Sequence, residues 1–334
     1  MADQDQLPVT ERAHYVANIF IAVTTPLLLL SLILLSIRIS TKLRLVCQIG
    51  WDDWLIVAGS ILASIDWALL VASTFWFIGP NHHYITPSRG LQSGMLGFIA
   101  VPIWAFALSC IKLSVALTLL RFLQATGWRV LLYIIIGVQI FFAIANTIFA
   151  LLLCRPIAAS WNPFIAGAKC LNHEALRVAS TASSYIDIAT DIILSLIPLV
   201  FLTKLHRPFQ EKILVFSLMA MGLFASIASI RKVIIIKQWG TGDTWSMAIS
   251  MSTWTCIEEF FGILAACFPC LKMPLQRALA KIGVTLNVNR SFRYLNSFFE
   301  NPPHTDVHLE PHQDKDETKN EENISAVRQI NIHV

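Results

Sequence analysis

The chain has 334 residues, of which 55% are hydrophobic and only 14% are charged. A soluble protein carries about 25% charged residues, so this chain has too little polar surface to cover a globule in water. The formal net charge is only +4, and no basic stripe with interleaved aromatic residues argues for a nucleic-acid partner. We therefore expect a multi-pass protein of the plasma membrane or an endomembrane, with the lipid bilayer as its first partner.

Seven apolar segments are long enough to cross a bilayer, whose hydrocarbon core needs about 20 helical residues. They are continuous apolar runs without strict alternation, which favours helices over a β-barrel. In chain order they are Val16–Ile37, Trp54–Phe77, Gly94–Leu120, Val130–Leu153, Ala182–Leu202, Ile213–Ile236 and Met247–Phe268. The sequence thus predicts an all-α bundle of seven transmembrane helices over residues 16–275.

Basic residues at the ends of these segments are divided unequally between the two sides of the membrane. One side holds eleven Lys and Arg residues and the other holds six. Because the richer side faces the cytoplasm in most membrane proteins, we expect residues 1–15 to lie outside the cell. Residues 276–334 would then form a polar, largely disordered cytoplasmic tail, in which the sequons at Asn289 and Asn323 should carry no glycan.

Several ionisable residues fall inside the apolar segments, where each charge costs at least about 2.5–3.5 kcal/mol at the membrane centre. Most of them are expected to surround an interior polar pocket that binds a ligand. This set comprises Asp66, Asp187, Asp191, Arg231, Glu258 and Glu259.

Asp187 and Asp191 are four residues apart and therefore lie on one face of their helix. At a rise of about 1.5 Å per residue, Arg231 lies at a similar depth, so it could pair with either aspartate. A structural ion pair that fixes helix packing is the alternative to a ligand site. Lys112 lies deep in the third segment, where snorkelling to the inner interface and a functional role are both open.

Glu258 and Glu259 are adjacent and cannot occupy the same helix face. Glu259 continues a polar stripe with Ser252 and Thr255, which favours Glu259 as the inward-facing residue. One of the two glutamates is expected to be paired or protonated.

Cys154 and Cys170 flank the loop between the fourth and fifth segments, on the expected outer side. An oxidising compartment and this separation favour a disulfide over two free thiols. The other cysteines show no Cys/His spacing typical of a zinc site, so no metal is expected.

An ordered set of short motifs resembles the fungal rhodopsin-domain family of seven-helix membrane proteins, also called satratoxin-cluster-like. The resemblance covers roughly Ala13 to Leu275. Its motifs are Asp52-Asp53-Trp54-Leu55-Ile56, Ile111-Lys112-Leu113-Ser114 leading to Arg121, Cys154, Pro156, Trp161, Cys170, Asp191, Pro198, Arg231, and Glu258 followed by Cys267-Phe268-Pro269.

The resemblance implies a fungal source and a seven-helix fold. It also implies a cytoplasmic motif of Asp52, Asp53 and Arg121, and it favours Glu258 over Glu259. Some members of this family are regarded as receptor-like sensors, and others occur in specialised-metabolite gene clusters. The family more often has an Asn at the position of Asp187.

Retinal is not expected as a cofactor, because Met247–Phe268 contains no lysine for a Schiff base. Leu120-Arg121 lacks the acidic residue that precedes this arginine in animal G-protein-coupled receptors, so a G-protein partner rests on fold analogy alone.

The sequence favours a receptor-like sensor of a small apolar ligand, linked to specialised metabolism. The first alternative is an intramembrane acid/base enzyme, a cyclase or isomerase, using Asp66, Asp191 and Glu258. The second is a proton-coupled transporter, although no inverted repeat is visible. Whether the chain is an enzyme is left open.

Overall fold

A computed structural model describes residues 7–8, 11–45, 50–78, 84–85, 87–122, 126–162, 164–203, 209–238 and 243–281. All of these residues belong to one compact unit, residues 1–286. The tail expected over 276–334 lies outside the described residues from residue 282 onward, and so do both sequons.

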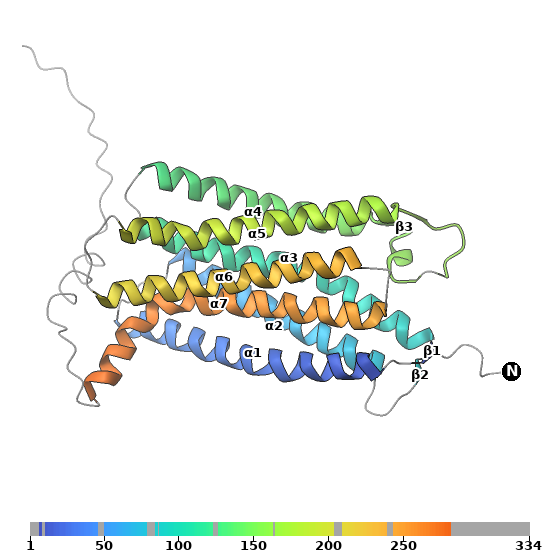
Figure 1. Cartoon of the computed structure of the whole chain (residues 1–334), viewed down its shortest axis with the longest axis horizontal. Helices are drawn as coiled ribbons and strands as arrows, with labels where there is room; N and C mark the ends of the chain where they lie inside the picture. Colours follow the sequence, from blue (N-terminus) through green and yellow to red (C-terminus); the bar gives the residue numbers. More distant parts are fainter. Residues whose placement is uncertain are drawn as a thin grey trace, which may run out of the picture. The chain divides into compact units, whose positions relative to one another are not determined.

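Seven long helices make up the described part of the chain and lie lengthwise beside one another (Figure 1). Each coincides with one of the seven apolar segments, which confirms the all-α prediction. α7 continues past the domain boundary expected at residue 275. The helices are α1 (Glu11–Leu45), α2 (Trp51–Ile78), α3 (Pro87–Phe122), α4 (Thr126–Leu152), α5 (His173–Thr203), α6 (Phe209–Gln238) and α7 (Thr244–Lys281).

Among the described residues, four helices are long and apolar enough to cross a membrane. They are α1 over Glu11–Arg44, α2 over Trp51–Phe75, α3 over Pro87–Arg121 and α4 over Thr126–Leu152. The outer surface of the bundle agrees with this assignment, since large apolar side chains such as Tyr133, Ile134 and Phe141 on α4 are exposed. Apolar exposure on this scale suits a lipid environment and not water.

α3 contributes to two apolar cores that the described residues of the bundle form. One core contains Phe20 of α1, Ile56 of α2, Ile111 of α3 and Phe260 of α7. The other joins α3 to α4 and α5 around Leu132.

Close packing of α2 against α3 fixes the position of α3. A Cβ atom added at Gly59 of α2 would lie 3.0 Å from the Ile111 side chain of α3. Because Lys112 follows Ile111 directly, this contact also sets the direction in which Lys112 points.

In the part of the chain that the structure describes, two short antiparallel two-stranded sheets lie outside the helices. β1 (Leu7–Pro8) pairs with β2 (Tyr84–Ile85), and β3 (Cys154–Arg155) pairs with β4 (Lys169–Cys170). The 3-10 helix η1 (Ile157–Ser160) lies between β3 and β4. Cys154 is directly opposite Cys170, with 4.1 Å between their Cα atoms, and the two form a disulfide. The predicted bridge is therefore confirmed.

Candidate functional site

Lys112 of α3 is buried against one face of α5. Its Nζ atom is 3.1 Å from Asp187 Oδ1 and 2.9 Å from Asp191 Oδ1, and it also donates to the Thr190 hydroxyl. Both aspartates therefore lie on one face of α5, as their spacing predicts. Snorkelling of Lys112 to the inner interface is wrong, since only 5% of this residue is exposed.

The predicted pairing of Arg231 with Asp187 or Asp191 is wrong. Arg231 is exposed on the outer surface of the bundle, where its guanidinium carbon lies 5.7 Å from the centre of the Trp254 ring. Lys112 supplies the cation for both aspartates instead. Consecutive residues on a helix point about 100° apart, so Arg231 faces outward and the next residue faces inward.

That next residue, Lys232, is 2% exposed and forms a buried ion pair with Glu258 of α7. Ser229 donates a second hydrogen bond to Glu258, with 2.7 Å between Oγ and Oε1. The Lys232 ammonium also lies 5.0 Å from the centre of the Trp104 ring of α3. These contacts connect α6, α7 and α3 at one point inside the bundle.

Both glutamates of α7 are buried, with 1% of Glu258 and 0% of Glu259 exposed. α7 packs against α1, α2, α3 and α6, so adjacent residues of α7 face different helices. Glu258 faces Lys232 of α6. Glu259 interacts electrostatically with Asp66 of α2. In the described part of the chain, none of the four carboxyl oxygens of Asp66 and Glu259 has a hydrogen-bond partner. The polar stripe favours Glu259 as the inward-facing residue and the family pattern favours Glu258, and the structure buries both.

A second charged cluster joins four helices at the end of the bundle where α2 begins. Arg38 of α1 lies 2.9 Å from both Asp52 and Asp53 of α2, and Lys42 bonds to the same pair. Arg121 of α3 reaches Asp52 at 2.8 Å. Arg38 also donates to the main-chain carbonyl of Ala266 in α7. The structure thus brings together the three residues of the expected cytoplasmic motif and adds Arg38 and Lys42.

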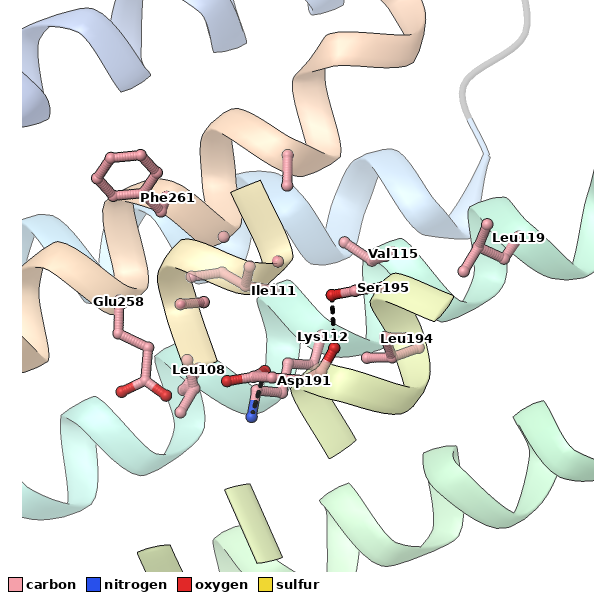
Figure 2. Close-up of a pocket in the computed structure, with 14 residues that line it drawn as sticks. Leu108, Ile111, Lys112, Val115, Leu119, Asp191, Leu194, Ser195, Glu258 and Phe261 are labelled. Carbon is pink, nitrogen blue, oxygen red and sulfur yellow. Dashed lines mark hydrogen bonds and ion pairs between the residues drawn. The ribbon is translucent and has the colours of Figure 1, made fainter. Parts of the chain in front are cut away.

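A pocket lies between α3, α5, α6 and α7, and Figure 2 shows the side chains that line it. Most of the lining is apolar, while Lys112, Asp191 and Glu258 supply its ionisable groups. The full lining set is Leu108, Ile111, Lys112, Val115, Leu119, Asp191, Leu194, Ser195, Gly222, Ala225, Glu258, Phe261, Gly262 and Ala265. Of the six residues expected to form a ligand pocket, Asp191 and Glu258 are in this set, while Asp66, Asp187, Arg231 and Glu259 are not.

Small residues on α6 and α7 give the pocket its shape. A Cβ atom at Gly222 of α6 would lie 1.7 Å from Ser195 Oγ of α5, and one at Gly262 of α7 would lie 2.8 Å from the Ile111 side chain. The second oxygen of Asp191 has no hydrogen-bond partner in the described part of the chain. The site therefore offers an unused buried acceptor beside an apolar wall, an arrangement suited to a mostly apolar molecule with one donor group.

Sequence reasoning gave Lys232, Ser229 and Trp104 no role in the polar interior. Lys232 stands close to the expected outer end of its helix, where a basic residue needs no partner. An available signal was Ser229, because Ser229 and Lys232 are three residues apart and share a helix face.

An all-helical bundle with an apolar outer surface and buried ion pairs defines an integral membrane protein with a polar interior. The fungal rhodopsin domain model matches residues 37–277, and the chain belongs to that family. No solved structure matches the chain.

Three fungal relatives resemble the chain at low identity. The fugralins biosynthesis cluster protein 2 of Gibberella zeae is 29% identical over 140 residues, which are 42% of this chain and 33% of that protein. A SAT4 family membrane protein of Emericella nidulans is 24% identical over 64% of this chain and 54% of its own length. The matched part is thus a third to about half of these two relatives.

The third relative matches over more of both chains. It is the polyenoic acids biosynthesis gene cluster protein Ba17b of Metarhizium anisopliae, 23% identical over 83% of this chain and 77% of its own length. Two of the three relatives are thus named for biosynthetic gene clusters, and one is named as a membrane protein.

Proposed function

We propose that this chain is a receptor-like membrane protein with seven transmembrane helices and its amino terminus outside. It binds a small, mostly apolar ligand in the pocket between α3, α5, α6 and α7. The observation that supports this proposal is the unused oxygen of Asp191, which is buried at the pocket wall beside apolar side chains. A ligand hydroxyl or amine would satisfy this acceptor while its hydrocarbon body fills the remainder of the pocket.

Ligand binding would act on the helix packing through the ion pairs. Asp191 and Glu258 belong to α5 and α7, while their lysine partners belong to α3 and α6. A ligand that bonds to either carboxyl group changes the interaction of that group with its lysine. The ligand would therefore bind one arrangement of the four helices more tightly than another. Such a difference in affinity is what allows a ligand to shift a conformational equilibrium.

The output of this receptor would be a specialised-metabolite pathway, a proposal supported by the two relatives named for biosynthetic clusters. The test is metabolite profiling of a deletion strain complemented with the parent chain or with Asp191→Asn, at equal amounts of membrane protein. We expect Asp191→Asn to leave the deletion profile unchanged. Full recovery of the parent profile would count against the receptor proposal.

An intramembrane enzyme is the second candidate, favoured by the presence of Asp191 and Glu258 on the same pocket wall with Lys112. These groups could protonate or deprotonate a lipophilic substrate, whereas Asp66 does not line the pocket. The same profiles separate the two candidates. Loss of a receptor lowers all products of the pathway together, whereas loss of an enzyme makes one intermediate accumulate.

A further inference from the structure

The seam between α6 and α7 is closed on its outer side by two side-chain pairs. Arg231 of α6 lies over the Trp254 ring of α7. Phe224 of α6 stacks on Phe261 of α7, with 5.4 Å between ring centres and 23° between ring planes. The two pairs are seven residues apart on each helix, or about 10 Å along the seam.

The Phe pair links the bundle surface to the pocket. Phe224 is 55% exposed on the outer surface, on the same stripe as Ile227 and Arg231. Phe261 of α7, which stacks on Phe224, also lines the pocket (Figure 2). The two stacked rings therefore lie between the pocket and the surroundings of α6.

The helix positions behind these rings carry small residues, two of which, Gly222 and Gly262, pack closely against Ser195 of α5 and Ile111 of α3. Where α6 and α7 line the pocket next to the Phe pair, they do so with Gly222, Ala225, Gly262 and Ala265. Polar contacts hold the seam together at Glu258, through Ser229 and Lys232, one turn of α7 from Phe261. Rotation of the two rings would thus open the wall without breaking an ion pair.

We propose that Phe224 and Phe261 form a lateral gate through which a ligand dissolved in the bilayer enters the pocket between α6 and α7. This inference rests on the proposed function, because it requires the pocket to bind a ligand. It adds that the ligand arrives from the membrane interior, so its class is a lipophilic alcohol or amine and not a water-soluble metabolite. An apolar molecule concentrates in the hydrocarbon core, and at this seam the apolar side chains of Phe224 and Ile227 are exposed on the outer surface of the bundle.

Photolabelling in lipid nanodiscs tests the gate. The probe is a long-chain alcohol that carries a diazirine, and the readout is the rate at which peptides covering Leu108–Leu119 of α3 become labelled. Phe224→Ala should raise this rate several-fold by removing one ring. The matched control is Phe141→Ala, which removes a ring from the outer surface of α4, where the residue is 74% exposed against 55% for Phe224 and no residue lines the pocket.

A second experiment holds the gate closed and measures whether labelling of α3 becomes slower. In a Phe224→Cys/Phe261→Cys variant, a bis-methanethiosulfonate reagent should bridge the seam and lower α3 labelling several-fold, and reductant should restore it. Phe224→Cys alone, treated in the same way, controls for the chemistry. If Phe224→Ala labels α3 no faster than Phe141→Ala, or bridging has no effect, the gate is wrong although the pocket still binds. If α3 is unlabelled in the parent and in every variant, the pocket proposal fails as well.

Discussion

Lys112 of α3 and Asp191 of α5 form an ion pair of 2.9 Å inside the bundle, with 5% and 7% of the two residues exposed. Pairs of this kind contribute little net stability compared with an apolar core, but removing one partner leaves an uncompensated charge. The pair therefore fixes which faces of α3 and α5 meet, and it holds Asp191 in the lining of the pocket with one carboxylate oxygen left without a hydrogen-bond partner in the described part of the chain.

Lys112→Met should lower the stability of the purified protein strongly, because two carboxyl groups lose their cation. Breaking a buried pair costs about 3–5 kcal/mol. The measurement is thermal unfolding in detergent, together with the yield of folded protein. Adding Asp187→Asn and Asp191→Asn to Lys112→Met should recover part of the loss. A Lys112→Met protein as stable as the parent would show that the lysine is not the required cation.

Arg231 and Lys232 form a matched pair of adjacent cations with opposite surroundings. Lys232→Leu should be severely destabilising, since it strands Glu258 in the core. Arg231→Leu should lose only a cation–π contact, worth about 0.5–1 kcal/mol at an exposed site. The measurement is the melting temperature of each variant in the same detergent, which should fall much further for Lys232→Leu than for Arg231→Leu. Equal losses, or a larger loss for Arg231→Leu, would mean that the faces of α6 are assigned wrongly.

Gly222→Ala should destabilise the packing of α5 on α6, because its methyl group would overlap Ser195 Oγ and lie 2.8 Å from Ser195 Cβ. Overpacking of this kind costs about 1–3 kcal/mol. A Gly222→Ala/Ser195→Gly double variant removes both clashing atoms and should be more stable than Gly222→Ala alone. If the second change gives no recovery, the two helices do not approach at this position.

The disulfide between Cys154 and Cys170 should resist alkylation in native membranes until reductant is added. Replacing both cysteines with serine should lower stability by about 2–4 kcal/mol. Mass spectrometry of alkylated peptides is the direct measurement. Immediate alkylation of both thiols without reductant would contradict the bridge.

Membrane orientation can be tested with the sequons at Asn289 and Asn323, which lie outside the described residues. A cytoplasmic carboxyl end never meets the glycosylation machinery, so neither asparagine should carry a glycan. Glycopeptide mapping that finds a glycan at either residue would reverse the proposed orientation.

The sequence was sufficient to predict the seven helices, the disulfide and the shared face of Asp187 and Asp191, because each depends on local spacing or composition. The rotation of α6 was less clearly indicated. Ile213–Ile236 is strongly apolar, and the short stripe of Ser226, Ser229 and Lys232 is its main indication that Lys232 and not Arg231 points inward.

The direction of Lys112 was hidden in the sequence. It depends on how α3 packs against α2 at Gly59, a contact between residues far apart in the chain. The same is true of Asp66, which lies near enough to Glu259 of α7 for the two carboxyl groups to interact electrostatically. A count of buried charges therefore identifies the polar interior, while the partners depend on tertiary packing.

The most direct test of the ligand pocket is capture of its ligand by purified protein. Nanodiscs with the parent chain, Ala225→Phe or Ala68→Phe would be incubated with an organic extract of a fungal culture that expresses the chain, then analysed by mass spectrometry. Ala225 lines the pocket, whereas Ala68 is exposed on α2. The parent and Ala68→Phe should retain the same small molecule, and a folded Ala225→Phe should lose it. Equal retention by Ala225→Phe would contradict the assignment of this pocket as the ligand site.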